Sequence, residues 1–294
     1  LVSRAIQTEI LEGRGVGEAR DAVHLDLTHL DPAQIDAKLP DVSDFVRTYL
    51  GIEPKTAPIP IQPTAHYAMG GIPTNTTGEV VVDADGTVLP GLYAAGECAC
   101  VSVHGANRLG TNSLLDIVVF GKRGGRAMVE FARQVDLPEL PDTVEEDVRT
   151  AIERMKSGAG DEKVAWVRAD LQAEMTNQAF VYRSEDSLAS ALDEISALRE
   201  RYHRVSIDDK GPTFNYDLTE ALELGYLLDL AEAVVASAWA RTESRGAHFR
   251  TDHPVRDDAN WMKHTLAYRQ DDGSIRLDYK DVEGDKYIPM ERKY

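Results

Sequence analysis

The sequence predicts a chain of mixed α/β and α+β class, with short strands and glycine-rich turns followed by amphipathic helices. Residues 79–97 contain β-branched and small apolar runs around the turn Asp83-Ala84-Asp85-Gly86. From about residue 143, apolar residues recur at helical spacing. The 294 residues, 43% hydrophobic and 28% charged, are enough for about two globular domains.

The first twelve residues have the pattern of an amphipathic helix. Val2, Ile6 and Ile10 recur at a spacing of four, and no capping residue precedes them. We therefore expect the chain to begin inside a helix, as a fragment would. The following glycines at 13, 15 and 17 lack the G-x-G-x-x-G spacing and come after a helix, so they predict a loop and not a dinucleotide-binding turn.

The next elements are short. Residues 24–27 predict a strand, and residues 31–51 predict short helices bounded by Asp31-Pro32 and Gly51. The proline-rich segment TAPIPIQPTAHY predicts an extended connector and a domain boundary.

Strands dominate the segment that follows. Residues 80–82 and 87–89 predict a hairpin, and residues 92–95 predict a separate strand that ends at Gly96-Glu97. Residues 113–133 predict a helix capped by Asn112 or Ser113.

Helices dominate the rest. Thr143 and Glu146 have the spacing of a capping box. Three apolar stripes then predict an up-down bundle of three helices: Val164, Val167, Leu171 and Met175; Leu188, Leu192, Ile195, Leu198 and Tyr202; Leu218, Leu222, Leu227 and Leu230. Residues 266–269 and 275–279 predict a terminal hairpin.

Composition excludes several classes of function. The net charge of −18 argues against nucleic acid as a partner. No run of about 18 apolar residues occurs, so the sequence predicts no membrane span. Cys98, Cys100 and His104 offer three metal ligands, but two thiols on a buried strand are the favoured interpretation.

Three residues suit contact with a cofactor. Glu97, if it ends a strand, is placed to accept hydrogen bonds from ribityl or ribose hydroxyls, although an ordinary loop carboxylate is the alternative. Ser113 and Leu114 begin a helix, whose free N–H groups favour developing negative charge; a plain helix start is the alternative.

Two residues suit contact with a carboxylate ligand. Arg108, just before that helix, can hold a carboxylate through two parallel hydrogen bonds, or it can form a structural salt bridge. His66 precedes the turn Met69-Gly70-Gly71, where a ligand can approach the backbone, although a lone His is more often structural. For His104 the structural interpretation is favoured.

Three motifs in order, HYAMGGI, GLYAAGE and HGANRLGTNSLLD, closely resemble the flavoprotein subunit of succinate dehydrogenase and fumarate reductase. The similarity covers essentially the whole chain and corresponds to the C-terminal half of that subunit. It implies that residues 1–62 complete a capping domain and residues 63–132 complete an FAD-binding α/β domain. Residues 133–245 would be a helical bundle domain, and residues 246–294 a small C-terminal region with a hairpin.

The resemblance also implies roles for single residues. Glu97 would bind the ribityl region of FAD, Ser113 and Leu114 would contact its isoalloxazine ring, and His66 and Arg108 would grip the carboxylates of succinate or fumarate. Electrons would pass to an iron–sulfur subunit and then to quinone in a membrane anchor. The flavoprotein would sit peripherally on the cytoplasmic face of the plasma membrane, held by those partner subunits.

The differences from the family pattern are absences. The chain has no G-x-G-x-x-G motif, and the resemblance places the proton-shuttling arginine just upstream of Leu1, so no catalytic residue is expected within it. We expect the 294 residues alone to be inactive. The alternatives are a fumarate reductase, an L-aspartate oxidase, which usually has Cys where Met69 stands, and a non-catalytic module that docks a partner.

Overall fold

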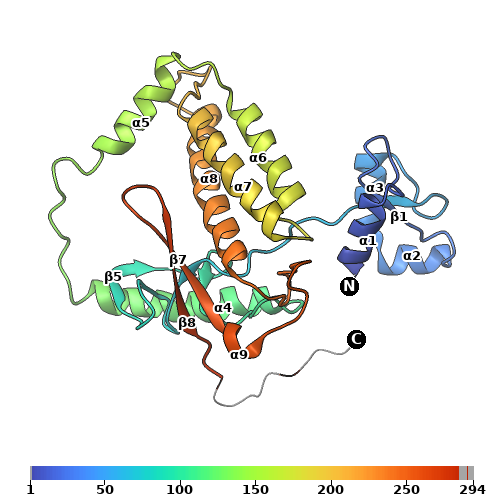
Figure 1. Cartoon of the computed structure of the whole chain (residues 1–294), viewed down its shortest axis with the longest axis horizontal. Coiled ribbons are helices and arrows are strands. Elements are labelled where there is room, and N and C mark those ends of the chain that lie inside the picture. The colour runs from blue at the N-terminus through green and yellow to red at the C-terminus, as the bar shows by residue number, and fades with distance from the viewer. Residues whose placement is uncertain (1, 285–289, 291–294) are drawn as a thin grey trace. The chain divides into compact units, whose positions relative to one another are not determined.

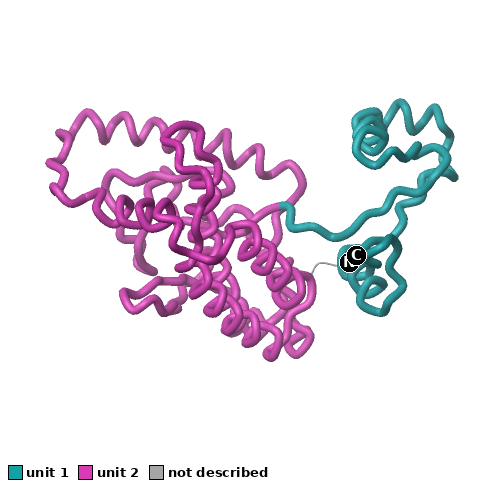
Figure 2. Tube along the Cα trace, turned by 90° about the horizontal axis from the view of Figure 1, so that it is seen from above, with its two compact units in different colours: residues 1–66 teal, residues 67–294 magenta. Residues whose placement is uncertain are grey.

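The computed structural model describes residues 2–284 and residue 290. Its contacts divide the chain into two compact units, residues 1–66 and residues 67–294 (Figure 2). The predicted division into four domains, with its first boundary after residue 62, stays a prediction.

The first unit combines short helices with a two-stranded sheet. Helix α1 (Val2–Leu11) forms as expected and is followed by Gly13 with φ +79°. Strand β1 (Val23–Leu25) pairs antiparallel with β2 (Ile59–Ile61), so part of the proline-rich connector is in fact a strand. The predicted strand over residues 24–27 was therefore two residues too long at its C-terminal end and one too short at the other.

The helical segment between these strands begins and ends where the sequence predicts. Helix α2 (Pro32–Lys38) is capped by Asp31, whose carboxylate accepts from the Ala33 N–H at 2.9 Å. Helix α3 (Pro40–Leu50) ends at Gly51, whose left-handed φ of +66° suits a residue without a side chain.

The second unit begins with two small sheets and a long helix. Strand β3 (Ile72–Pro73) pairs parallel with β6 (Ala99–Cys100), and β4 (Glu79–Val81) pairs antiparallel with β5 (Val88–Tyr93). The prediction of a separate strand over residues 92–95 was wrong, because β5 is continuous and ends at Tyr93. Gly96 and Glu97 therefore lie in the turn before β6.

Helix α4 (Asn112–Ala132) follows β6 after an eleven-residue loop, residues 101–111. The predicted caps were wrong: the N-cap residue is Thr111, at φ +65°, and its side chain makes no capping bond. The side chain of Asn112 instead contacts His104. The start of α4 is thus shaped by the preceding loop rather than by a polar cap.

Helices α6 (Val164–Gln178), α7 (Glu185–Tyr202) and α8 (Tyr216–Ala240) pack together as a bundle (Figure 1). Helix α5 (Glu146–Ser157) adds the fully buried Met155 to the same core. The capping box of Thr143 and Glu146 does not form, because the N-cap residue of α5 is Glu145.

The third apolar stripe was half wrong. Leu218 and Leu222 pack against the core, but Leu227 and Leu230 are exposed. The face of α8 that enters the core is instead rich in alanine and comprises Ala221, Leu224, Leu228, Ala231, Val235 and Ala238. Small residues on a buried face allow neighbouring helices to pack closely.

The C-terminal part returns to strand structure. After the short helix α9 (Asp258–Trp261), β7 (Lys263–Arg269) and β8 (Ile275–Asp281) form an antiparallel hairpin, longer than predicted at both outer ends. Among the described residues, no helix is long and apolar enough to cross a membrane.

Candidate functional site

Arg108 lies in the loop between β6 and α4 and has few partners. One Nη atom donates to the Leu109 carbonyl at 3.1 Å, and the guanidinium carbon lies 4.4 Å from the centre of the Tyr67 ring. Its Nε is buried and has no hydrogen-bond partner among the described residues. No ion pair to Arg108 occurs in that part of the chain either, although the sequence has 50 acidic residues. The guanidinium is therefore available to an anionic ligand.

Tyr67 and His104 form a network behind Arg108. His104 Nε2 lies 2.9 Å from an oxygen of the buried Asp116 and 3.1 Å from the Tyr67 hydroxyl. Its Nδ1 lies 3.1 Å from the side-chain nitrogen of Asn112. Burial raises the pKa of Tyr67, and the charge of Asp116 adds to that effect. His104 is thus fully engaged in holding the loop, which favours its structural interpretation.

The first turn of α4 lies directly after Arg108 in the chain. The Ser113 N–H has no acceptor within the described residues, whereas the Leu114 N–H donates to the Thr111 carbonyl at 3.0 Å. The Leu114 side chain is 61% exposed. The helix start therefore offers the Ser113 N–H as a free donor at its positive end and the apolar Leu114 side chain beside it.

Glu97 is an exposed turn residue and not a strand end. One of its carboxylate oxygens accepts from the Ala68 N–H at 2.9 Å, which ties the turn to the residues after His66. The other oxygen has no hydrogen-bond partner among the described residues and can accept a hydrogen bond from a hydroxyl group. The predicted location at the carboxyl end of a strand was wrong, since Glu97 instead precedes β6.

The turn at Met69-Gly70-Gly71 has a different cause from the one expected. Gly71 has φ +118°, and a side chain there would meet the Cys98 carbonyl oxygen at 2.4 Å. The close approach at Gly71 is therefore made by the chain itself, while the space at Gly70 is open. His66 is exposed and is the last residue of the first unit.

The cysteines do not share a buried strand. Cys98 is exposed and precedes β6, and Cys100 is the partly buried last residue of β6; both are free thiols. Within the described residues, no group of three His, Cys, Asp or Glu side chains is arranged to hold a metal ion.

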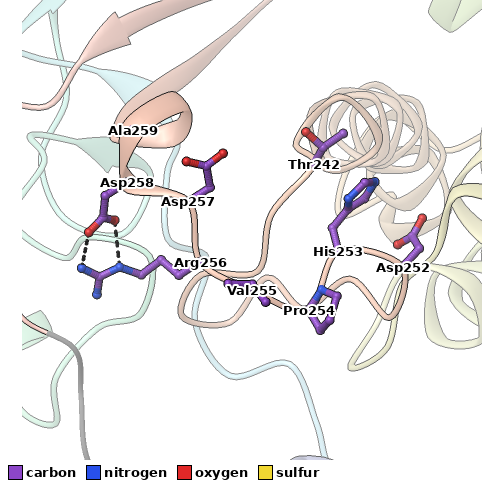
Figure 3. Close-up of a pocket in the computed structure, with 9 residues that line it drawn as sticks. All are labelled: Thr242, Asp252, His253, Pro254, Val255, Arg256, Asp257, Asp258 and Ala259. Carbon is purple, nitrogen blue, oxygen red and sulfur yellow. Dashed lines mark hydrogen bonds and ion pairs between the residues drawn. The ribbon is translucent and has the colours of Figure 1, made fainter.

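A separate surface hollow of about 610 Å³ lies along residues 252–259 (Figure 3). Its cation Arg256 is already paired with Asp258, as the dashed lines in Figure 3 show. The hollow thus lacks an arginine without an ion-pair partner, the feature that distinguishes Arg108.

Two family models match the chain. The model described as FAD binding domain matches residues 1–114, and the model described as fumarate reductase flavoprotein C-term matches residues 168–294. Together they indicate the class of FAD-binding flavoproteins.

Individual relatives narrow this class. The chain is 44% identical over 288 residues to the succinate dehydrogenase flavoprotein subunit of Rickettsia bellii, covering 96% of this chain and 48% of the relative. It is 43% identical over 301 residues to the fumarate reductase flavoprotein subunit of Mycobacterium tuberculosis, covering 100% of this chain and 50% of the relative. A solved variant of E. coli quinol fumarate reductase superposes with a TM-score of 0.90 at 38% identity. The superposition covers 99% of this chain and 49% of the solved chain.

The chain belongs to the family of succinate dehydrogenase and fumarate reductase flavoprotein subunits. It spans about half the length of the curated relatives it matches. Sequence reasoning proposed Arg108 and the α4 start as site residues but gave no role to Tyr67 and Asp116, which hold the Arg108 loop. Tyr67 adjoins His66 in the HYAMGGI motif, which was the only signal for it.

The family's cofactor is FAD, and the residues present fit it. A flavin ring is apolar on its faces and becomes anionic when reduced. The exposed Leu114 side chain and the free Ser113 N–H at the positive end of a 21-residue helix suit those two properties. The free oxygen of Glu97 suits a hydroxyl of the ribityl chain.

Proposed function

We propose that this chain supplies the carboxylate-binding and part of the flavin-binding residues of a succinate dehydrogenase. The observation that carries the proposal is Arg108, a guanidinium without an ion-pair partner among the described residues, next to the open first turn of α4. A planar guanidinium binds a carboxylate through two parallel hydrogen bonds, which fixes the ligand's orientation as well as its position.

The proposed roles follow from these positions. Arg108 clamps one carboxylate of succinate, and His66 donates to a carboxylate. Ser113 and Leu114 face the flavin ring, and Glu97 accepts from the ribityl chain. FAD, when bound, supplies the hydride acceptor. The chain's own residues bind and orient, since the proton shuttle is expected to be an arginine outside these residues.

The domain roles are part of the same proposal. Residues 1–62 belong to the capping domain and residues 63–132 to the FAD-binding domain, with the helical bundle at 133–245 and the C-terminal region at 246–294. Because the sequence has no G-x-G-x-x-G motif, we expect the 294-residue polypeptide alone not to oxidise succinate.

Electron transfer requires partners. We propose that electrons pass to an iron–sulfur subunit and then to quinone in a membrane anchor, on the cytoplasmic face of the plasma membrane. The relative solved as a quinol fumarate reductase supports a quinone as the distal partner. Relatives named for both directions leave fumarate reduction as the reverse activity of the same site.

The test is succinate-dependent dye reduction by the purified flavoprotein that contains this chain. Wild-type protein should oxidise succinate, and His66→Leu should raise KM by about tenfold, because leucine has no donor for a hydrogen bond to the carboxylate. His29→Leu, at another exposed histidine in the same unit, is the matched control and should leave KM unchanged. Absence of succinate oxidation in the wild type, or equal KM values in both variants, would contradict the proposal.

A further inference from the structure

We propose that the turn Arg245–His248, which follows the helical bundle in the chain, is a brace that positions Arg108. The inference rests on the proposed function of Arg108. The turn lies more than 130 positions from Arg108 in the sequence. It contains none of the residues proposed to contact substrate or flavin.

The brace contacts the Arg108 loop through the backbone. The Ala247 N–H donates to the Ala106 carbonyl at 3.0 Å, two residues before Arg108. Gly246 lies so close to Ala106 that a Cβ would meet its carbonyl oxygen at 2.3 Å and its carbonyl carbon at 2.5 Å. Backbone-to-backbone contact at this distance requires glycine and leaves the loop no space to relax toward the turn.

The turn itself is closed by two backbone bonds. The Arg245 N–H donates to the His248 carbonyl at 2.8 Å, and the His248 N–H donates to the Arg245 carbonyl at 3.0 Å. Gly246 takes the left-handed φ of +59° inside this turn. The position of the Ala247 N–H is therefore set by the turn and not by a free loop.

A buried carboxylate anchors the turn to the rest of the unit. Glu243 is completely buried and accepts from both Arg241 and Arg245, and it also accepts from the Asp257 N–H at 2.9 Å. Such a carboxylate fixes the orientation of the Arg245 side chain at the start of the turn, because each carboxylate oxygen is bonded to an identified donor. Glu243 is thus a positioning residue that acts on Arg108 through the turn.

Two further contacts tie this region to the site loop and the bundle. His248 Nδ1 lies 2.8 Å from an Nη atom of Arg183, in the segment between α6 and α7. His264 on β7 lies 3.0 Å from the hydroxyl of Ser102, which has the unusual φ of +70° at the start of the loop that carries Arg108. The site loop is therefore braced at both Ser102 and Ala106 by residues from beyond the bundle.

The experiment compares two glycine substitutions with similar backbone strain in the flavin-loaded enzyme. Gly246→Ala places a methyl group against Ala106, whereas Gly86→Ala, at φ +83°, meets only the end of a lysine side chain at 4.0 Å. We expect Gly246→Ala to raise the succinate KM by about tenfold or more, with a smaller effect on kcat, because small misplacements of a binding group are costly. Gly86→Ala should leave KM unchanged.

Hydrogen exchange provides a readout that does not depend on activity. The readout, called loop exchange, is the exchange of the amides that donate to carbonyls of the 101–111 loop, which belong to Asn112, Leu114 and Ala247. In Gly246→Ala and in Glu243→Gln, loop exchange should be at least about tenfold faster, while the amides of α7 keep wild-type protection. Leu198→Ala, which destabilises the bundle core without touching the turn, should not change exchange in the loop or KM. Glu243→Asp keeps the charge, so its KM should lie between the KM of the wild type and that of Glu243→Gln.

The outcomes separate the inference from the proposed function. If wild-type enzyme oxidises succinate and Gly246→Ala has wild-type KM and wild-type loop exchange, the brace is refuted. If loop exchange rises in the variants but the wild type does not bind succinate, the brace stands as a structural support and the proposed function fails. If Gly246→Ala does not fold, Glu243→Gln decides, and wild-type loop exchange in that variant overturns the inference.

Discussion

The ring of Tyr67 should contribute measurably to carboxylate binding, although it touches no substrate. It lies 4.4 Å from the guanidinium carbon of Arg108, and its hydroxyl lies 3.1 Å from His104. The same guanidinium donates to the Leu109 carbonyl at 3.1 Å. Replacing Tyr67 with Leu removes the ring on which Arg108 rests, whereas replacing it with Phe removes only the hydroxyl.

The size of the effect follows from this geometry. A guanidinium over an aromatic ring gains about 0.5–1 kcal/mol when exposed and about 2 kcal/mol when desolvated. Arg108 is partly buried with a buried Nε, so about 1–1.5 kcal/mol applies, which is about 5–12-fold in affinity. Tyr67→Phe keeps the ring and should weaken binding by less than about threefold.

The assay is isothermal titration of fumarate into the oxidised, flavin-loaded enzyme. Tyr67→Leu should raise Kd by about 5–12-fold, and Tyr67→Phe should stay close to wild type. An unchanged Kd in Tyr67→Leu would refute the role of the ring. Equal losses in both variants would show that the hydroxyl network, and not the ring, supports Arg108.

Two stability measurements test the rest of the structure. Leu228→Ala, at a fully buried site on α8, should lower the free energy of unfolding in urea by about 2–5 kcal/mol, whereas Leu230→Ala, at a site that is 62% exposed, should cost less than about 1 kcal/mol; similar losses would contradict the assigned core face. Burial, helped by the charge of Arg183, lowers the pKa of His248 to about 4. As the pH falls from about 6.5 to 4, this histidine is therefore protonated in the unfolded chain but stays neutral in the folded chain. Stability should therefore fall by up to about 3 kcal/mol over that range, and His248→Gln should flatten this slope in pH-dependent unfolding.

Local sequence signals predicted the elements that depend on local chemistry. Asp31-Pro32 and Gly51 mark helix ends in the structure because capping and left-handed φ are properties of single residues. The predicted caps of α4 and α5 were wrong, because the start of a helix also depends on tertiary contacts. Asn112 is drawn away by His104, a tertiary contact eight residues earlier that no local pattern encodes.

Spacing alone also failed on α8. Leucines at 227 and 230 have helical spacing, yet small alanines form much of the buried face. Close helix packing selects small residues, and a pattern based on large apolar residues misses them.

The candidate site shows the same division. Arg108 and Ser113 were proposed because a cation and a helix start are visible in the sequence. The supports of Arg108 were not, because Tyr67 and the proposed 245–248 brace reach its loop through long-range packing, and Asp116 acts through His104.

The most direct test of the central claim, that Arg108 binds a dicarboxylate beside the flavin, is the flavin absorbance change on titrating fumarate. The wild-type flavoprotein should give a saturable change. Arg108→Met should weaken binding by about 100-fold, since a paired carboxylate loses about 3 kcal/mol, and Arg108→Lys should lie between them. A Kd in Arg108→Met equal to that of the wild type would contradict the account.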